Sequence, residues 1–237
     1  MRFAPIALLL GCSTEVPPAD PPGAASDRLA VSTVQDPDAT DRPEVGSRVT
    51  LDGVIVTAVD TYDETGDGDI GTIYVQDPAG GPFSGIAVFA PSVSGEPLRV
   101  GDVVQVIGEL AEFELGQIDP AWADDTGRTV TQLVSASARW TGEWTPPEPT
   151  VVDVADLASD PTAETWEGVL VRVEGARATA PTDDRGAFPI AEGLEVDDDL
   201  HGLGDVASGT TFAELTGVVS YIYDYKLLPR GPEDVVR

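Results

Sequence analysis

Val103–Ile118 reads VVQVIGELAEFELGQI, and a similar spacing of apolar residues returns in Phe212–Leu227, which reads FAELTGVVSYIYDYKL. When Gly108 is aligned with Gly217, an offset of 109 residues (217 − 108), the apolar positions around the two glycines coincide. A strand pattern that occurs twice at a fixed offset is the signature of an internal repeat. The chain is therefore predicted to hold two copies of one small β domain rather than one large domain.

A second match supports the repeat: Leu51–Val56, LDGVIV, resembles Trp166–Val171, WEGVLV. The two matches together place Gly53 and Gly168, like Gly108 and Gly217, at equivalent corners of two small barrels, where the backbone has to bend. With 25 glycines, 20 prolines and short β-branched runs, the composition favours an all-β protein. Five strands in each copy predict two tandem OB-fold-like five-stranded barrels. A β-sandwich is the competing interpretation.

The chain divides by composition into five segments. The first 45 residues show no sequence pattern that is typical of a folded domain. After the N-terminal apolar run they are rich in Pro, Ala, Asp and Ser and have no apolar periodicity. Two stretches, Asp153–Ala158 and Thr162–Trp166, are predicted as short helical turns, the second with Asp160 as a plausible N-cap and Pro161 at the first helical position. The expected segments are a signal peptide (1–11), a disordered tether (12–45), an OB-like domain (46–139), a linker (140–165) and a second OB-like domain (166–237).

The N-terminus carries the pattern of an export signal. Arg2 precedes the apolar run Phe3–Leu10, which is too short to cross a bilayer as a helix, and the only cysteine, Cys12, follows it. Leu9-Leu10-Gly11-Cys12 resembles the lipobox of bacterial lipoproteins. The resemblance implies cleavage before Cys12, lipidation of its sulfur and a membrane anchor, and Ser13 resembles an outer-membrane sorting signal. The expected location is the outer membrane or cell surface, on the periplasmic or extracellular side. A free thiol in a frayed terminus is the alternative.

The charge is strongly negative. The formal net charge is −29, with 13 Lys and Arg against 42 Asp and Glu, and one histidine. Such a field repels phosphate backbones, so nucleic acid is an unfavourable partner unless a local basic patch exists.

Several stretches resemble the OB-fold regions of secreted bacterial nucleases, where such regions precede a catalytic domain of the endonuclease/exonuclease/phosphatase type. The similarity lies in Val54–Asp60, Ile73–Pro78, Leu98–Gly108, Trp166–Val173 and Leu215–Asp234, the last reading LTGVVSYIYDYKLLPRGPED. The catalytic domain of that family is missing from this chain. The resemblance therefore implies an accessory binding unit rather than a hydrolase.

An acidic loop follows the first predicted strand. Asp63, Asp67 and Asp69, with an intervening glycine, match the first half of a calcium-binding loop, but the twelfth position is Tyr74 rather than the usual glutamate. These three carboxylates are a candidate calcium site, and calcium is the one cofactor expected. A solvated acidic loop is the alternative.

A tyrosine cluster near the C-terminus is the candidate ligand surface. Tyr221, Tyr223 and Tyr225 alternate with other residues, and a period of two would place three rings on one face of a strand, where they could stack on bases or sugars. Lys226 and Arg230 supply nearby positive charge. The alternative is that Tyr221 continues the core register and the other rings cover the barrel end or the seam between domains.

The function expected from these features is that of a non-catalytic, membrane-anchored binding or adaptor module, with a protein or a polysaccharide as partner. An accessory single-stranded nucleic-acid-binding role is the alternative. An enzyme is not expected: the chain has no Gly-x-Ser-x-Gly motif, and its single histidine lies in an acidic stretch. A hydrolase that uses two carboxylates is a third interpretation, although no spacing marks such a pair.

Overall fold

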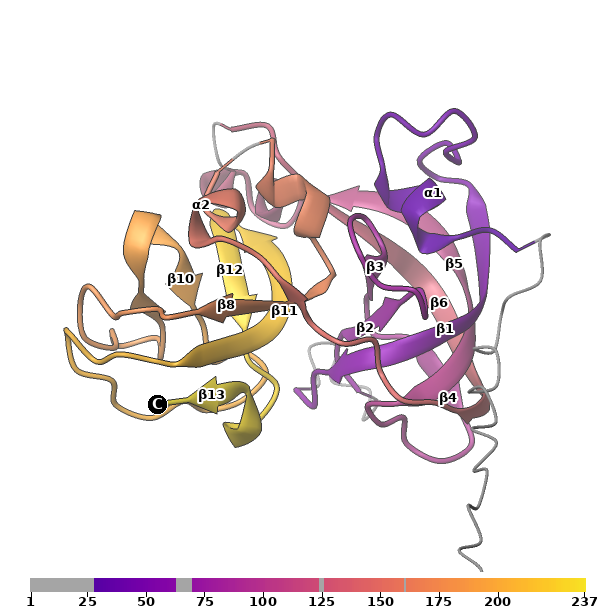
Figure 1. Cartoon of the computed structure of the whole chain (residues 1–237). Helices are drawn as coiled ribbons and strands as arrows, with labels where there is room; N and C mark the ends of the chain where they lie inside the picture. The colour runs from indigo at the N-terminus through magenta and orange to yellow at the C-terminus, as the bar shows by residue number, and fades with distance from the viewer. Residues whose placement is uncertain (1–27, 63–69, 124–125, 160) are drawn as a thin grey trace, which may run out of the picture.

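The structure is a computed structural model that describes residues 28–62, 70–123, 126–159 and 161–237. Its strands form two sheets, one in each half of the chain, which lie side by side (Figure 1). The prediction of an all-β protein is confirmed. No helix among the described residues is both long and apolar enough to span a bilayer. Cys12 and the three predicted calcium ligands, Asp63, Asp67 and Asp69, lie outside the described residues.

We call the part that holds β1 to β6 the first half, and the part that holds β7 to β13 the second half. The strands of the first half are β1 (Arg48–Val59), β2 (Ile73–Gln76), β3 (Gly85–Val88), β4 (Ser92–Ser94), β5 (Asp102–Phe113) and β6 (Val130–Glu143). Those of the second half are β7 (Thr150–Val151), β8 (Leu170–Glu174), β9 (Phe188–Pro189), β10 (Glu195–Val196), β11 (Glu214–Ile222), β12 (Asp224–Leu228) and β13 (Val235–Val236).

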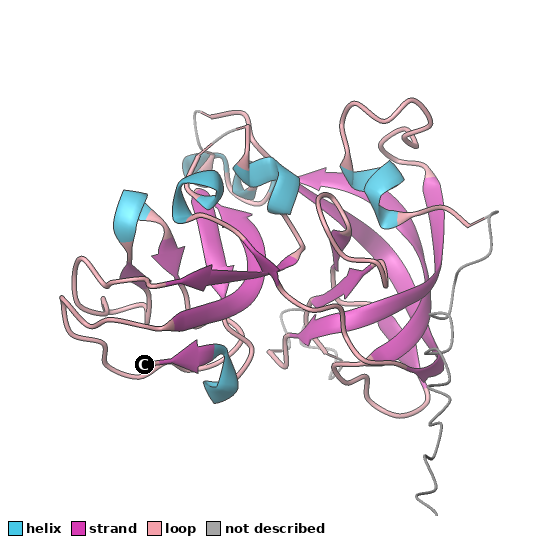
Figure 2. Cartoon of the chain, viewed as in Figure 1, coloured by secondary structure: helices cyan, strands magenta, loops and turns pink. Residues whose placement is uncertain are grey.

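The described helical segments are short, and most of them lie along the upper edge of the two sheets in Figure 2. They are α1 (Val31–Gln35), η1 (Leu115–Gln117), η2 (Pro120–Trp122), α2 (Val154–Leu157), η3 (Ala163–Trp166), η4 (Ala191–Gly193) and η5 (Pro232–Asp234). The two helical turns predicted in the linker are thereby confirmed as α2 and η3.

Five strands of each half are paired in the same order, and β4, β7 and β13 lie outside this shared set. In the first, the order is β3-β2-β1-β5-β6-β4, and β3 also pairs in parallel with β6, so the path returns to its start. In the second, the order is β7-β8-β11-β12-β10-β9, with β10 and β12 parallel. The chain after β8 also reaches β9, because the Thr179 N–H donates to the Pro189 carbonyl at 2.8 Å. The parallel pair is thus β3–β6 in one half and β10–β12 in the other.

The strand register supports one of the two sequence matches and corrects the other. Gly108 on β5 pairs with Val49 on the first long strand, and Gly217 on β11 pairs with Val171 on β8, so these two glycines are equivalent. Gly53 lies four residues after Val49, whereas Gly168 lies three residues before Val171. The residue that lies four after Val171 is Gly175. Gly53 and Gly175 have φ of 76° and 65°.

The predicted equivalence of Gly53 and Gly168 is therefore wrong, and Gly175 is the counterpart of Gly53. Both bend the strand that pairs with the Gly108 or Gly217 strand. In β1 the register with β5 shifts between Asp52 and Val54, and beyond Gly175 the chain still pairs through the Arg177–Thr211 bridge.

The last strand of the first half is much longer than the sequence indicates. We expect a strand within Arg128–Ser135, and β6 instead continues to Glu143, into the predicted linker. Its second part buries only alanines, Ala136 and Ala138, which give a weak apolar signal. Small residues are required there: a Cβ on Gly108 of the neighbouring strand would lie 3.0 Å from the Leu133 Cβ and 3.1 Å from the Ala136 Cβ.

The predicted tether is wrong over its last part. Within 12–45, the segment from Leu29 onward packs on the first half, and α1 buries Val31 and Val34 completely. The Arg42 guanidinium also forms an ion pair with Glu112 of β5 at 2.7 Å. The absence of a repeating apolar pattern hid this segment, because a helix of five residues contributes only two core side chains.

Each half has its own core. The core of the first half is formed by Val, Leu and Ile side chains of β1, β2, β3, β5 and β6, and that of the second half includes Phe188 and Phe212, whose rings stack 5.5 Å apart. A third, smaller apolar cluster joins the halves; it contains Ala58, Tyr74, Ala87, Leu170, Val218 and Leu228. The halves therefore share a packed seam.

Candidate functional site

The halves approach each other most closely at two glycines. A Cβ on Gly168, which has φ of 74°, would lie 2.7 Å from the Gly85 carbonyl carbon and 2.7 Å from the Ile86 nitrogen. No other residue allows both this positive φ and this contact between backbones. Gly168 thus serves the seam rather than the repeat. Beside it, the Leu170 N–H donates to the Gln76 Oε1 across the seam at 3.1 Å.

A buried glutamate also lies in the seam. Glu167 accepts from the Thr131 N–H at 2.9 Å through Oε1, and the Gln35 Nε2 of α1 donates to its main-chain carbonyl at 3.2 Å. Burial raises the pKa of Glu167 well above its ordinary value, the charge of Glu164 raises it further, and the bonds from Thr131 and Gln35 oppose the rise. The buried Glu167 Oε2 and Gln35 Oε1 have no hydrogen-bond partner. A proton on Glu167 would remove the cost of a buried charge and turn its second oxygen from an acceptor into a donor.

The predicted tyrosine face does not form. The chain reverses between β11 and β12 at Tyr223, which has φ of 64°, so Tyr221 and Tyr225 lie opposite each other on paired strands. Their rings meet edge to face, with centroids 5.1 Å apart, and both residues are 4% exposed. Their hydroxyls bond to Thr126 and Glu164. Only Tyr223 is exposed, at 43%. The alternative interpretation, in which Tyr221 continues the core register, holds.

The two predicted basic ligands are already paired. The Lys226 Nζ lies 2.5 Å from the Asp197 Oδ2 and 3.5 Å from the Glu195 Oε2. The Arg230 guanidinium forms a bidentate ion pair with the Asp234 carboxylate, with both N···O distances at 2.7 Å. Its Nη1 also donates to the Thr57 carbonyl across the seam at 3.1 Å. These side chains hold the fold together, so the basic patch that nucleic acid would require is not formed by them.

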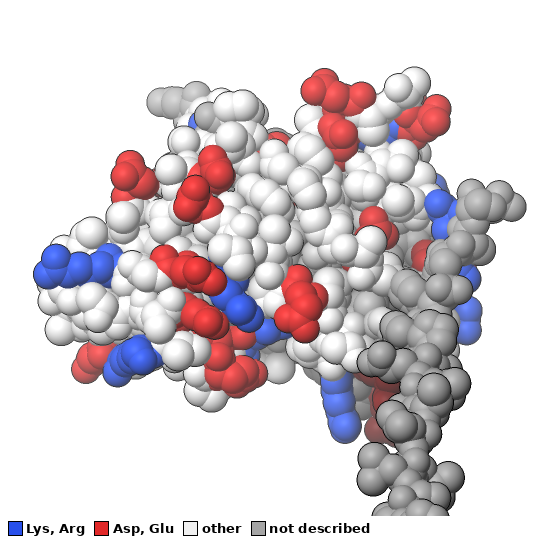
Figure 3. All heavy atoms as spheres, in the orientation of Figure 1, with Lys and Arg blue, Asp and Glu red and all other residues white. Residues whose placement is uncertain are grey.

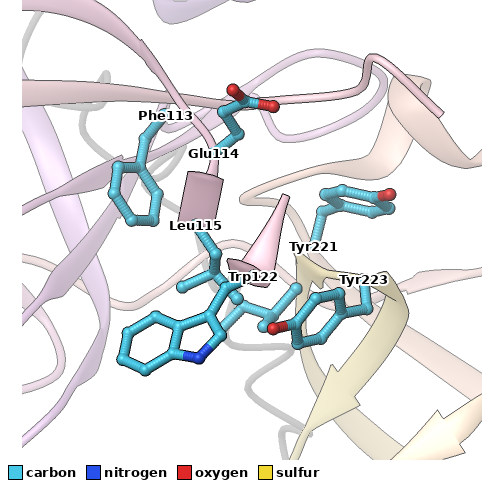
Figure 4. Close-up of a pocket in the computed structure, with 7 residues that line it drawn as sticks. Phe113, Glu114, Leu115, Trp122, Tyr221 and Tyr223 are labelled. Carbon is cyan, nitrogen blue, oxygen red and sulfur yellow. The ribbon is translucent and has the colours of Figure 1, made fainter. Parts of the chain in front are cut away.

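The hollow around the tyrosines is too small for a ligand. Figure 4 shows Phe113, Leu115 and Trp122 of the first half gathered opposite Tyr221 and Tyr223 of the second. The space between them is about 10 Å³, which is room for one water molecule at most. It adjoins a far larger space.

That larger space is a cleft of about 660 Å³ between the halves. Its walls are largely aromatic and aliphatic, and both halves contribute to it. Its lining includes the side chains of Asp60, Tyr62, Tyr74, Phe89, Phe113, Gln132, Asp199 and Tyr221. A volume in this range, with apolar walls and a few polar groups, is typical of small-molecule sites.

The floor of the cleft is a row of residues that face outward from neighbouring strands. Tyr74 on β2 pairs with Ala87 on β3, which pairs with Gln132 on β6. Gln132 is 7% exposed, and its side-chain amide bonds to no other residue that the structure describes. The amide atoms are not among the fully buried atoms that lack a partner, so they reach the open space of the cleft, where a ligand can bond to them.

The second half has the same row with different chemistry. Its parallel pair aligns Val196 and Leu227 with Val88 and Leu133 of the first half, all four fully buried. By this register Glu195 corresponds to Ala87, and Lys226 corresponds to Gln132. Ala87 packs in the seam and Gln132 forms no ion pair, and both residues line the cleft. We call the row of the second half, with its ion pair, closed, and the row of the first half, which has none, open.

Two carboxyl groups border the cleft. Asp199 lies at the edge of the cleft. Burial, which removes water from the carboxyl group, raises the pKa of Asp199 to about 6; the charge of Asp197 adds to this rise, and the charge of Lys226 opposes it. Burial also raises the pKa of Asp60, although the Tyr62 N–H, which donates to it at 2.8 Å, lowers it. No lysine or arginine is among the described residues that line the cleft.

Other hollows carry weaker chemistry. One of about 440 Å³ surrounds Trp140, but the Trp140 Nε1 donates to Asp102 at 3.2 Å and the other Asp102 oxygen accepts from the Arg99 N–H at 2.7 Å. Elsewhere, acidic and basic side chains are interspersed with neutral surface on the face in Figure 3. No group of three His, Cys, Asp or Glu residues suited to a metal ion occurs in the part of the chain that the structure describes.

Comparison with known proteins gives no guide to the site. No family model matches the chain, and no curated protein and no solved structure matches it. The site therefore has to be interpreted from its residues. Of the predicted site residues that the structure describes, Tyr221 alone lines the cleft. Gln132, Asp199 and Asp60 could not be found from the sequence, because they come from three separate segments that meet only in the folded protein.

Proposed function

We propose that this protein is a non-catalytic, extracytoplasmic binding module that holds its ligand in the cleft between its two halves. The observation that carries the proposal is the row Tyr74–Ala87–Gln132, where the Gln132 amide, which bonds to no other described residue, opens onto a cleft of about 660 Å³. The equivalent row of the other half has no such vacancy, because Lys226 and Glu195 fill it.

We infer that each half is an OB-type barrel. The support is a pairing order that five strands of each half share, β1, β2, β3, β5 and β6 in the first and β8, β9, β10, β11 and β12 in the second. In this set Gly53 and Gly175 are equivalent, and the third and fifth strands pair in parallel. Such barrels bind ligands on the face of their second and third strands and in the adjoining loops. The cleft lies on β2 and β3, the equivalent strands of the first half.

We further propose that a lipid on Cys12 holds the protein at the outer membrane or cell surface. The support is the sequence alone, in which the single cysteine ends a short export signal. Growth with an alkyne analogue of palmitate should label the full chain in the membrane fraction, and Cys12→Ser should abolish the label. Equal labelling of Cys12→Ser would contradict the anchor.

A soluble fragment set of amines, alcohols and carboxylic acids tests the binding role by thermal shift. Fragments should raise the melting temperature of the wild type, and Thr72→Trp, which places a large ring at the cleft wall, should remove the shifts. The control Val151→Trp changes an exposed residue outside the cleft and should keep them. If no fragment gives a shift, or if both variants behave alike, the cleft is not the binding site.

The alternative, an accessory role in binding single-stranded nucleic acid, makes a different prediction. Fluorescence anisotropy with a labelled oligo(dT) strand would then show binding that weakens steeply as salt increases. We expect no binding, because acids border the cleft and Lys226 and Arg230 are paired within the protein.

A further inference from the structure

We propose that the cleft selects a compact organic cation, that is, a ligand with an ammonium group attached to an aromatic or apolar body. This assignment of a ligand class rests on the proposed binding role of the cleft. Three features of the lining support it. Asp60 and Asp199 line the cleft, and no lysine or arginine is among the described lining residues. Several aromatic side chains also line it, and the Gln132 amide bonds to no other described residue.

The charges of the lining favour a cation. Asp60 and Asp199 enter the cleft from opposite halves, and both lie close enough to the Tyr74 hydroxyl to raise its pKa, in addition to the larger effect of burial. Lys226 is the basic group that faces Asp199, together with the acids Asp197 and Asp198. Because Lys226 is bound to Asp197 and Glu195, it leaves the cleft acidic. An anion would be repelled there, and a cation attracted.

The walls suit the body of such a ligand. Tyr62, which is 71% exposed, lies in the lining with Phe89, Phe113 and Tyr221. Aromatic faces attract ammonium groups through the ring quadrupole and cover an apolar body at the same time. The base of a nucleotide would also stack on rings, but the two carboxylates would repel the phosphate of the nucleotide.

The polar groups match an ammonium group in number. A primary ammonium group has three N–H donors and no acceptor. Asp60, Asp199 and the carbonyl oxygen of Gln132 are acceptors that border the same cleft. The Gln132 amide opens onto the cleft and bonds to no other residue that the structure describes, so a ligand N–H would bond to an oxygen that the protein leaves unpaired.

Calorimetric titration with three probes of matched size tests the assignment: 2-phenylethylamine, 2-phenylethanol and 3-phenylpropanoate. The amine should bind about tenfold more tightly than the alcohol, and the carboxylate most weakly. Asp199→Asn should lower the affinity for the amine about tenfold and leave that for the alcohol unchanged. The matched control Asp205→Asn removes one charge at an exposed position outside the cleft lining, so its affinities should equal those of the wild type.

The pH dependence gives an independent measurement. Because the pKa of Asp199 in the free protein is about 6, the affinity for the amine should fall as the pH decreases from 7 to 5, while the affinity for the alcohol stays constant. Equal binding of all three probes, blocked by Thr72→Trp, would overturn the cation assignment and leave the binding role intact. If none of the three probes binds, both proposals fail.

Discussion

The two halves of this protein share a strand order but differ in one row of outward-facing residues. In the second half Glu195 and Lys226 close the row with an ion pair, and in the first half Ala87 and Gln132 leave it open beneath a cleft. The fold alone would permit a site on either half. The difference between equivalent positions is therefore a better guide to function than the features that both halves share.

The largest expected effect concerns the contact that holds the halves together. Gly168→Ala should lower the free energy of unfolding by about 4 kcal/mol, because it combines a strained positive φ with a clash against the Gly85 backbone. Gly193→Ala is the matched control, since Gly193 has φ of 83° and nothing within 4 Å of an added Cβ. It should cost about 1 kcal/mol in chemical denaturation. Equal losses would show that the seam does not need the close approach.

Lys226→Met tests the closed row. The substitution leaves Asp197, which is 5% exposed, without its cation, so the free energy of unfolding at pH 7 should fall by about 3 kcal/mol. Burial alone would lower the pKa of Lys226, but its bond to Asp197 and the charges of Asp197 and Glu195 raise it overall. Chemical denaturation at pH 7 measures the loss. A loss below about 1 kcal/mol would contradict this role.

Glu167→Gln tests the buried carboxyl group in the seam. The folded protein holds the pKa of Glu167 well above the ordinary value of 4.5, so the free energy of unfolding should decrease as the pH rises from 4.5 through the folded-state pKa. A glutamine side chain is neutral at every pH, so it is buried without the cost of a charge. The variant should therefore be more stable than the wild type by about 1 kcal/mol at pH 7 and lose that gain below pH 4.5. Denaturation curves at the two pH values check the sign.

The smallest expected effect is at the open row. Gln132→Met replaces an amide that makes no hydrogen bond, so the free energy of unfolding should change by less than about 1 kcal/mol in either direction. Gln132 and Lys226 occupy equivalent positions, and the same substitution should be harmless at one and damaging at the other. A loss at Gln132 as large as that at Lys226 would mean that the open row has a structural partner.

The sequence predicts the repeated strands well and the site poorly. The Gly108 and Gly217 segments are long, Val-rich and similarly spaced, so their equivalence is evident from the residues alone. LDGVIV and WEGVLV are similar locally, but Gly168 is fixed by a contact with Gly85 that no local pattern encodes. The turn at Tyr223 was hidden for a related reason, because a tyrosine at positive φ carries no turn signal.

The cleft is a property of how the halves meet. Asp60, Gln132 and Asp199 are separated by more than sixty residues along the chain and become neighbours of one space only through the seam. The sequence nevertheless held one signal. A polar residue precedes a core leucine at matching places in the repeat, as Gln132-Leu133 and as Lys226-Leu227. Their contrast could have pointed to Gln132 as the exceptional position.

The most direct test follows the side-chain amide signal of Gln132 in a 15N-labelled protein as 2-phenylethylamine is added. The open-row account predicts that this signal and the backbone signals of Tyr74 and Ala87 shift together, while those of Glu195 and Lys226 stay in place. Shifts centred on Glu195 and Lys226, or a Gln132 amide that does not move at a saturating concentration of the amine, would contradict it.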